Sequence, residues 1–186
     1  MALARYASLC QESGIVPIVE AEVLMNGEHG LERSRDATDA ILWATFDQLH
    51  SQKVILEGLI LKPNMVVAGL ASTRQETVDE VAGATLNCLM RVVPAAVAGI
   101  AFLSGGQSSE LASARLNAMN VRAKAAGSPT PWPLGFSFAR AIQQPVLEIW
   151  RGKEANVSAA QQALYRQASF NRLARRSKFT DALEAA

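Results

Sequence analysis

The sequence predicts an α/β fold in which parallel strands alternate with helices. Four short apolar runs, each followed by a segment with helical periodicity, occur along the 186 residues. This alternation is typical of repeated βα units on a parallel sheet. Each run is followed by polar or glycine residues, the groups that parallel α/β folds collect at the carboxyl ends of their strands. With 49% hydrophobic residues the chain can bury one core, so we expect one domain over residues 1–186.

The first unit begins with a predicted strand over residues 15–19, rich in β-branched side chains. After a polar loop, Asp36 is the expected N-cap of a helix. The apolar face of this helix is formed by Leu42, Phe46 and Leu49, which are spaced by four and three residues.

The second unit begins with a predicted strand over residues 54–61, and Lys62 follows directly after it. Pro63 then closes the run, because proline cannot continue a central strand. Thr77 and Glu80 have the spacing of a capping box, which predicts that the next helix begins there.

The third and fourth units follow the same plan. The strand predicted over residues 97–103 leads into the polar and glycine residues 104–107, and Ser108 is the expected cap of the following helix. The strand predicted over residues 134–138 leads into residues 139–140. If the four strands are neighbours, the polar residues at their carboxyl ends lie together at one edge of the sheet and can form one site.

Composition argues against several classes of function. A formal charge of +1 gives no large electrostatic field that would attract nucleic acid. The basic residues between 172 and 178 are more typical of a solvated helix end than of a binding patch. No apolar stretch reaches the roughly 18 residues of a membrane span. His29 and His50 cannot build a three-histidine site, so we expect no metal and no other cofactor. Cys10 and Cys88 lie far apart, which suits reduced thiols in a cytoplasmic protein.

Lys62 is the first candidate for chemistry, because it is the charged residue at the end of an aliphatic run. Apolar surroundings disfavour an ammonium group, so a neutral amine becomes available to attack a carbonyl and form a Schiff base. The alternative is a strand-end lysine whose charge simply reaches solvent.

Glu20 and Glu22 are candidates for proton transfer. They are two residues apart, so on an extended strand both side chains leave on the same face. A carboxylate beside a lysine nucleophile can move protons while a carbinolamine forms and loses water. An ordinary acidic strand end is the alternative.

The residues after the third and fourth strands suggest a phosphate site. Ser104, Gly105 and Gly106 precede a helix and offer backbone N–H groups without bulky side chains. Arg140 offers a fork of donors that matches phosphate oxygens. A plain turn and a surface salt bridge are the alternatives. Together with Lys62, these residues suggest a phosphorylated ketone or aldehyde as substrate.

Several motifs occur together in a distinctive order: GIVPIVEAE at 14–22, LEGLILKPNM at 56–65, FLSGGQ at 102–107 and FSFARA at 136–141, with further matches at 3–11 and 150–156. In this order they resemble the class I fructose-bisphosphate aldolases, over nearly the whole chain. The resemblance implies a (β/α)₈ TIM barrel, of which this chain carries the last four βα units. It places residues 3–11 in a helix before them and residues 150–156 in the last helical region.

The resemblance also implies a role for each candidate. Lys62 corresponds to the Schiff-base lysine, Glu20 to the acid/base residue and Glu22 to a neighbouring carboxylate of a metal-independent glycolytic lyase. Four residues would hold a substrate phosphate, and two would line or support the pocket. The phosphate residues are Ser104, Gly105, Arg140 and Ala139, the last through its backbone N–H; the pocket residues are Leu103 and Trp132.

The chain departs from the family pattern at two sites and also in its length. Ala21 stands where the family usually has proline, and Phe138 and Ala139 stand where it commonly has tyrosine and glycine.

A complete barrel needs about 250 residues. A half barrel leaves strand edges unpaired, so we expect a homo-oligomer or a complementing N-terminal half. A non-catalytic half barrel that binds sugar phosphates is the alternative function, and transaldolase or deoxyribose-phosphate aldolase chemistry fits the motifs less well.

Overall fold

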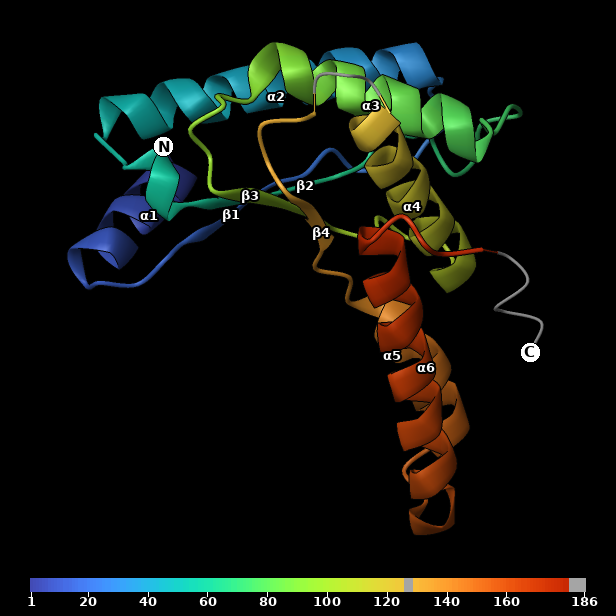
Figure 1. Cartoon of the computed structure of the whole chain (residues 1–186). Helices are drawn as coiled ribbons and strands as arrows, with labels where there is room; N and C mark the ends of the chain where they lie inside the picture. Colours follow the sequence, from blue (N-terminus) through green and yellow to red (C-terminus); the bar gives the residue numbers. More distant parts are fainter. Residues whose placement is uncertain (126–128, 181–186) are drawn as a thin grey trace.

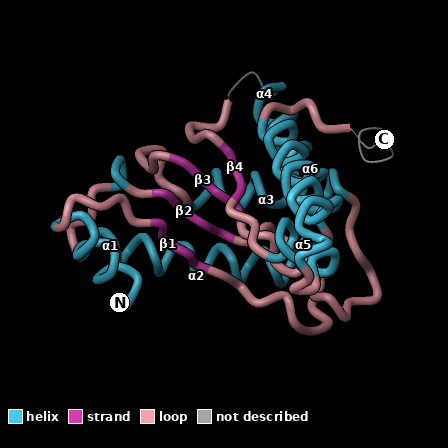
Figure 2. Tube along the Cα trace, turned by 90° about the horizontal axis from the view of Figure 1, so that it is seen from below, coloured by secondary structure: helices cyan, strands magenta, loops and turns pink. Residues whose placement is uncertain are grey.

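The computed structural model describes residues 1–125 and 129–180, and it contains a four-stranded parallel sheet with strand order β1-β2-β3-β4. Neighbours in the chain are neighbours in the sheet, as Figure 2 shows from below. The predicted α/β fold with a parallel sheet is confirmed. The strands are β1 Ile18–Ala21, β2 Ile60–Pro63, β3 Gly99–Phe102 and β4 Leu134–Phe136.

Six helices are assigned in the described residues, and α2 and α3 lie together over one face of the sheet (Figure 1). Helix α4 packs on α3, and α6 packs on both α4 and α5. Helices α5 and α6 form a hairpin that extends away from the sheet (Figure 1). The helices are α1 Ala2–Glu12, α2 Leu31–Ser51, α3 Val78–Val92, α4 Ser109–Ala125, α5 Arg140–Trp150 and α6 Val157–Arg175; the short 3₁₀ turns are η1 Leu56–Gly58 and η2 Glu154–Asn156.

The two faces of the sheet are buried to different extents. On the helix-covered face, Val19, Leu61 and Phe102 are fully buried and form part of the core. Along β1 and β2 these buried positions alternate with accessible ones, as expected when one face of a sheet carries the core. On the opposite face Ile18 keeps 44% of its surface exposed. No helix among residues 1–125 and 129–180 is long and apolar enough to cross a membrane.

The strand boundaries differ from the prediction in all four strands. β3 and β4 are shorter than the predicted 97–103 and 134–138, and the larger differences are at β1 and β2. The apolar run 54–61 does not form one strand, because residues 56–58 turn as η1 and β2 begins only at Ile60. The side-chain amide of Gln11 bonds both backbone groups of Ile55, at 2.9 Å from its N and 2.8 Å from its O, and so replaces a ladder partner. Register with β2 likewise extends β1 to Ala21, which pairs with Pro63.

The helix starts were predicted correctly at two of three positions. The Thr77–Glu80 capping box is present: Glu80 N donates to Thr77 Oγ1 (3.2 Å) and Thr77 N donates to Glu80 Oε2 (2.9 Å). The Glu80 carboxylate accepts from Thr77 N and also from Thr77 Oγ1 (2.9 Å), and these two bonds, the backbone one first, hold the pKa of Glu80 below its usual value. Ser108 also caps as predicted, accepting from Leu111 N at 3.2 Å.

The prediction that Asp36 caps α2 was wrong. The helix begins at Leu31 with Gly30 as N-cap, and Asp36 lies inside it, paired with Arg35 at 3.1 Å. The polar residues before Asp36 look like a loop, but leucine, glutamate and arginine have high helix propensity. Residues 150–156, which resemble the last helical region of the family, form the end of α5 and the turn into α6. The backbone of Arg151 adopts the left-handed conformation at this turn.

Two loops at the carboxyl end of the sheet are joined through their backbones. Leu70 N donates to Met25 O (2.8 Å), Ala71 N donates to Gly27 O (3.0 Å), and Gly69 N donates to His29 O (2.8 Å). This brings Gly69 so close that a Cβ built on it would lie 2.2 Å from Gly27 O. The position therefore requires glycine for steric reasons.

We expect Gly69→Ala to lower the free energy of unfolding by about 1–3 kcal/mol, because the loop backbones must separate to admit a methyl group. Gly83→Ala is the matched control: Gly83 lies inside α3 and faces only the flexible end of Arg122, so about 0.5–1 kcal/mol of stabilisation is expected. Urea unfolding measures both changes. Equal stability of Gly69→Ala and the parent chain would contradict the close approach.

Candidate active site

The candidate site is centred on an ion pair between two neighbouring strands. Glu20 of β1 and Lys62 of β2 are register partners in the parallel ladder. Lys62 Nζ lies 3.0 Å from Glu20 Oε1. The two side chains keep 19% and 43% of their surface exposed, so the pair remains open to a ligand. A carboxylate at this distance can accept a proton from the lysine or return one.

Glu22 is exposed and lies just past the end of β1. Within the described residues, no hydrogen bond or ion pair joins it to Lys62. The backbone after it is fixed by Asn64, a 3% exposed residue whose Oδ1 accepts from Val23 N at 2.9 Å. Asn64 Nδ2 also donates to Thr38 Oγ1 of α2 at 3.1 Å. Sequence analysis gave Asn64 no role, although an amide directly after a proline-ended strand is a signal for such a bridge.

The loop after β3 lies at the same end of the sheet. Leu103 N donates to Pro63 O at 3.1 Å, which ties the start of this loop to the end of β2. Ser104 is 6% exposed, and Gly105 and Gly106 have φ values of +56° and +73°. Only glycine adopts this left-handed backbone without strain. A Cβ on Gly105 would also lie 2.9 Å from Met25 Cε, so Met25 is a further neighbour of this loop that the sequence analysis missed.

Arg140 is exposed at the first residue of α5, and Ala139 is its N-cap. Arg140 and Gly106 line the same hollow of about 440 Å³ between the β3–α4 loop and α5. Ser109 Oγ donates to Ala141 O and joins the starts of α4 and α5. The structure thus brings Arg140 to the glycine loop, whereas Ser104 does not line this hollow.

Trp132 lies apart from the other candidates, and its place lining or supporting the pocket stays a prediction. It precedes β4, so it lies at the amino end of the strand, while the other candidates lie at or near the carboxyl ends. It is 2% exposed, and its Nε1 donates to Pro94 O at 2.8 Å. The indole therefore closes the opposite end of the sheet. Leu103, in contrast, is 6% exposed at the candidate site, where its Cδ1 would be 3.4 Å from a Cβ on Gly105.

Comparison with known proteins agrees with this geometry. The family model for fructose-bisphosphate aldolase class-I matches residues 1–186. The chain belongs to the class I fructose-bisphosphate aldolase family. Fructose-bisphosphate aldolase B of Gallus gallus is 50% identical over 177 residues, which cover 95% of this chain and 48% of that protein. A probable class 1 fructose-bisphosphate aldolase of Xylella fastidiosa (strain 9a5c) is 47% identical, covering 96% of this chain and 52% of that protein.

A solved aldolase structure gives the same result in three dimensions. Fructose-bisphosphate aldolase of Plasmodium falciparum, in a complex with TRAP and a small-molecule inhibitor, superposes with a TM-score of 0.90 at 45% identity. The superposition covers 96% of this chain and 50% of that one. The aldolase-family chain described here therefore spans about half the length of the relatives it matches, and its sheet is the corresponding part of a TIM-barrel fold.

Proposed function

We propose that this chain supplies the Schiff-base half of a class I fructose-bisphosphate aldolase. The reaction is the reversible glycolytic cleavage of fructose 1,6-bisphosphate to dihydroxyacetone phosphate and glyceraldehyde 3-phosphate. The observation that carries the proposal is the 3.0 Å pair between Lys62 Nζ and Glu20 Oε1, in a chain of this family. A cytoplasmic location stays a prediction from the sequence.

In the proposed mechanism Lys62 is the nucleophile and Glu20 moves protons. Glu20 accepts a proton from the ammonium group, and the neutral Nζ adds to the ketone carbon and forms a C–N bond. The ketone oxygen takes one proton from Nζ and becomes a hydroxyl, then takes a second proton from the Glu20 carboxyl group and leaves as water, which returns Glu20 to a carboxylate. The iminium that remains withdraws electrons from the carbon–carbon bond that breaks. Glu22 is proposed as a further carboxylate at the edge of the site.

A substrate phosphate is proposed to bind between the β3–α4 loop and the start of α5. Backbone N–H groups of Ser104, Gly105 and Ala139 would donate to its oxygens, together with the guanidinium of Arg140. The hollow shared by Arg140 and Gly106 supports an anion between the guanidinium and the glycine loop, although Ser104, Gly105 and Ala139 do not line that hollow. The Ala139 methyl group narrows the approach, since glycine is common at this position in the family.

Residues 1–186 are proposed to form one domain, the C-terminal half of a barrel that needs four further βα units. Among the described strands, β1 and β4 each pair with one neighbour only, which leaves two edges. Val16 and Ile18 keep 58% and 44% of their surface exposed beside the candidate site. The missing units can belong to another segment or another chain, and a second copy of this chain is the alternative. Without them, binding of sugar phosphates without turnover is the second candidate function, because the site is open on one side.

The central prediction concerns covalent trapping. After incubation with dihydroxyacetone phosphate and borohydride, we expect an adduct that maps to Lys62. Lys62→Arg should abolish it, because a guanidinium cannot serve as the amine. Glu20→Gln should slow trapping about 100-fold through loss of the proton acceptor. Lys53→Arg, at an exposed lysine after α2, is the control. An adduct that persists in Lys62→Arg would remove Lys62 from the mechanism.

The phosphate site is tested by comparing phosphorylated and unphosphorylated dihydroxyacetone in the same trapping assay. Arg140→Ala should weaken half-saturation by the phosphorylated ketone about tenfold or more, since a charge-assisted bond is lost. The unphosphorylated ketone should be unaffected. Arg166→Ala on α6 replaces another exposed arginine and serves as control. Equal weakening of both ketones would refute the phosphate role.

The half-barrel proposal predicts association. Sedimentation of the chain mixed with the N-terminal half of the Gallus gallus relative should show a 1:1 complex that traps faster than the chain alone. Ile18→Lys should break the complex, because it places a charge on the sheet face to be covered. Val121→Lys on α4 starts from the same 44% exposure and should leave the complex intact. The proposal would be contradicted if the chain stays monomeric in the mixture and traps the ketone as fast alone as with the added half.

A further inference from the structure

We infer that Arg115 of α4 is a positioning residue that clamps the two loops beside the candidate site and thereby sets the affinity for a substrate phosphate. The loops are residues 64–77, between β2 and α3, and residues 103–108, between β3 and α4. The phosphate part of this inference rests on the proposed function. The clamp itself rests on contacts of the described residues.

Arg115 is a charged residue held inside the protein. Only 4% of its surface is exposed, and burial lowers the pKa of its guanidinium, an effect that the nearby Glu76 opposes. An arginine stays charged in a protein, and burying a charge is costly unless it is paired and hydrogen-bonded. Leucine or methionine would fill the volume at lower cost. The contacts made by the guanidinium are therefore the feature to explain.

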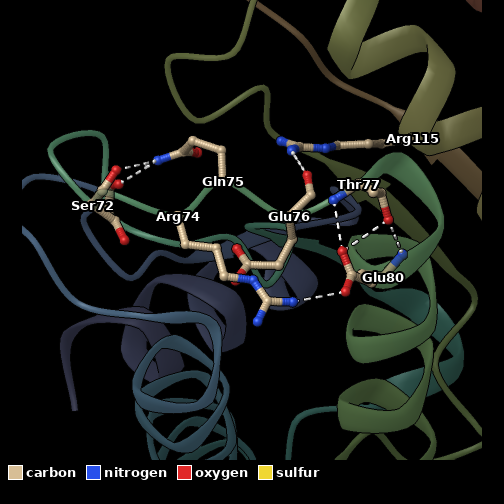
Figure 3. Close-up of polar contacts among 8 residues, drawn as sticks. Ser72, Arg74, Gln75, Glu76, Thr77, Glu80 and Arg115 are labelled. Atoms are coloured by element: carbon tan, nitrogen blue, oxygen red, sulfur yellow. Dashed lines mark hydrogen bonds and ion pairs between the residues drawn. The ribbon is translucent and has the colours of Figure 1, made fainter.

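The guanidinium bonds both loops at once. Arg115 Nη1 donates to Gln107 Oε1 at 2.8 Å, in the β3–α4 loop. Its Nη2 donates to Glu76 O at 3.2 Å, at the end of the β2–α3 loop (Figure 3). Among the described residues Nε has no partner, so the two outer nitrogens carry the bonding. A fork of donors fixed in one plane holds its two acceptors at a set separation.

Gln107 passes this contact to the proposed phosphate loop. A guanidinium only donates hydrogen bonds, so Gln107 Oε1 must face Arg115 and Nε2 must face the other way. Nε2 donates to Ser104 O at 2.8 Å and approaches Met65 Sδ at 3.7 Å. Ser104 O also accepts from Gln107 N at 3.1 Å. Arg115 thus selects the amide orientation that closes the turn through Gly105.

The β2–α3 loop is held at its two ends by the same relay, at Met65 through Gln107 and at Glu76 through Arg115. The Glu76 carboxylate is 7% exposed and lies 3.7 Å from Arg74 Nε, while its Oε2 has no partner within the described residues. Next to it, Gln75 Nε2 donates to Gly69 O at 2.9 Å. The charge of Glu76 thus lies inside the loop, where the Arg115 guanidinium is its buried counterpart.

The clamp has a direct consequence for anion binding. Gly105 and Gly106 are left-handed and unbranched, so the loop between Ser104 and Gln107 has little stiffness of its own. N–H groups bind a phosphate well only when they are held in the binding arrangement before the ligand arrives. Arg115 acts on this loop through Gln107 and does not bind the ligand itself. Its loss should therefore weaken phosphate binding and leave attack by Lys62 on an unphosphorylated ketone unchanged.

Amide hydrogen exchange of the 186-residue chain without substrate tests the clamp independently of activity. In Arg115→Met we expect exchange to rise about tenfold in both loops, because bonds to a charged donor are lost, with β2 and β3 unchanged. Arg115→Lys keeps the charge but loses the fork and should show the same pattern, and it serves if Arg115→Met does not fold. Gln107→Leu should loosen residues 103–108 and the Met65 end of the β2–α3 loop, and leave the Glu76 end unchanged, because Arg115 bonds Glu76 directly. Arg122→Met removes an exposed arginine of the same helix, paired with Asp79 at 2.8 Å, and is the control.

Unchanged exchange in either loop, or a uniform rise across the chain, would overturn the clamp. The second measurement is half-saturation of trapping by phosphorylated and unphosphorylated dihydroxyacetone. The preference for the phosphorylated ketone should fall about tenfold in Arg115→Lys, with the unphosphorylated ketone unaffected. Equal loss for both ketones would overturn the role in phosphate affinity. Absence of trapping in the parent chain would count against the proposed function instead, and the exchange pattern would still decide the clamp.

Discussion

The register between β1 and β2 is the constraint on which the rest of the site depends. It sets Glu20 opposite Lys62 on the same face, 3.0 Å apart at their charged atoms. Side chains alternate along a strand, so a slip of one residue would turn one partner toward the helices. The buried amide of Asn64 supports this register, because it joins the end of β2 to the residue after Glu22 and to α2.

The division of the sheet into two unlike faces explains how chemistry and stability coexist. The helix-covered face carries Val19, Leu61 and Phe102, whose complete burial contributes to the core. The other face carries the ion pair among exposed apolar residues such as Ile18. In the aldolase family this is the interior side of a barrel. In the complete barrel proposed above, four further βα units would cover this face and withdraw the pair from water, which strengthens electrostatic interactions inside the site.

Buried and half-buried polar side chains organise the loops at the carboxyl ends of the strands. Asn64 and Arg115 bond loop backbones 41 and 39 positions away. Gln107 bonds the backbone of Ser104 in its own loop and approaches Met65, 42 positions away. A purely apolar core would be less costly, but apolar contacts do not specify where a carbonyl or an N–H points. The arrangement gives up some stability for defined loop geometry, as a site assembled from separate strands requires.

The sequence by itself determined the βα alternation, the capping box at Thr77 and Glu80, and the order of polar strand ends that resembles the aldolases. These features depend on side-chain periodicity and on contacts within a few residues. Tertiary structure decided where β2 begins, since Gln11 bonds Ile55 across 44 positions. It also decided that Trp132 lies at the far end of the sheet and that Arg115 reaches Glu76 across 39 positions. Such contacts follow from how the helices pack on the sheet, and local patterns carry no record of that packing.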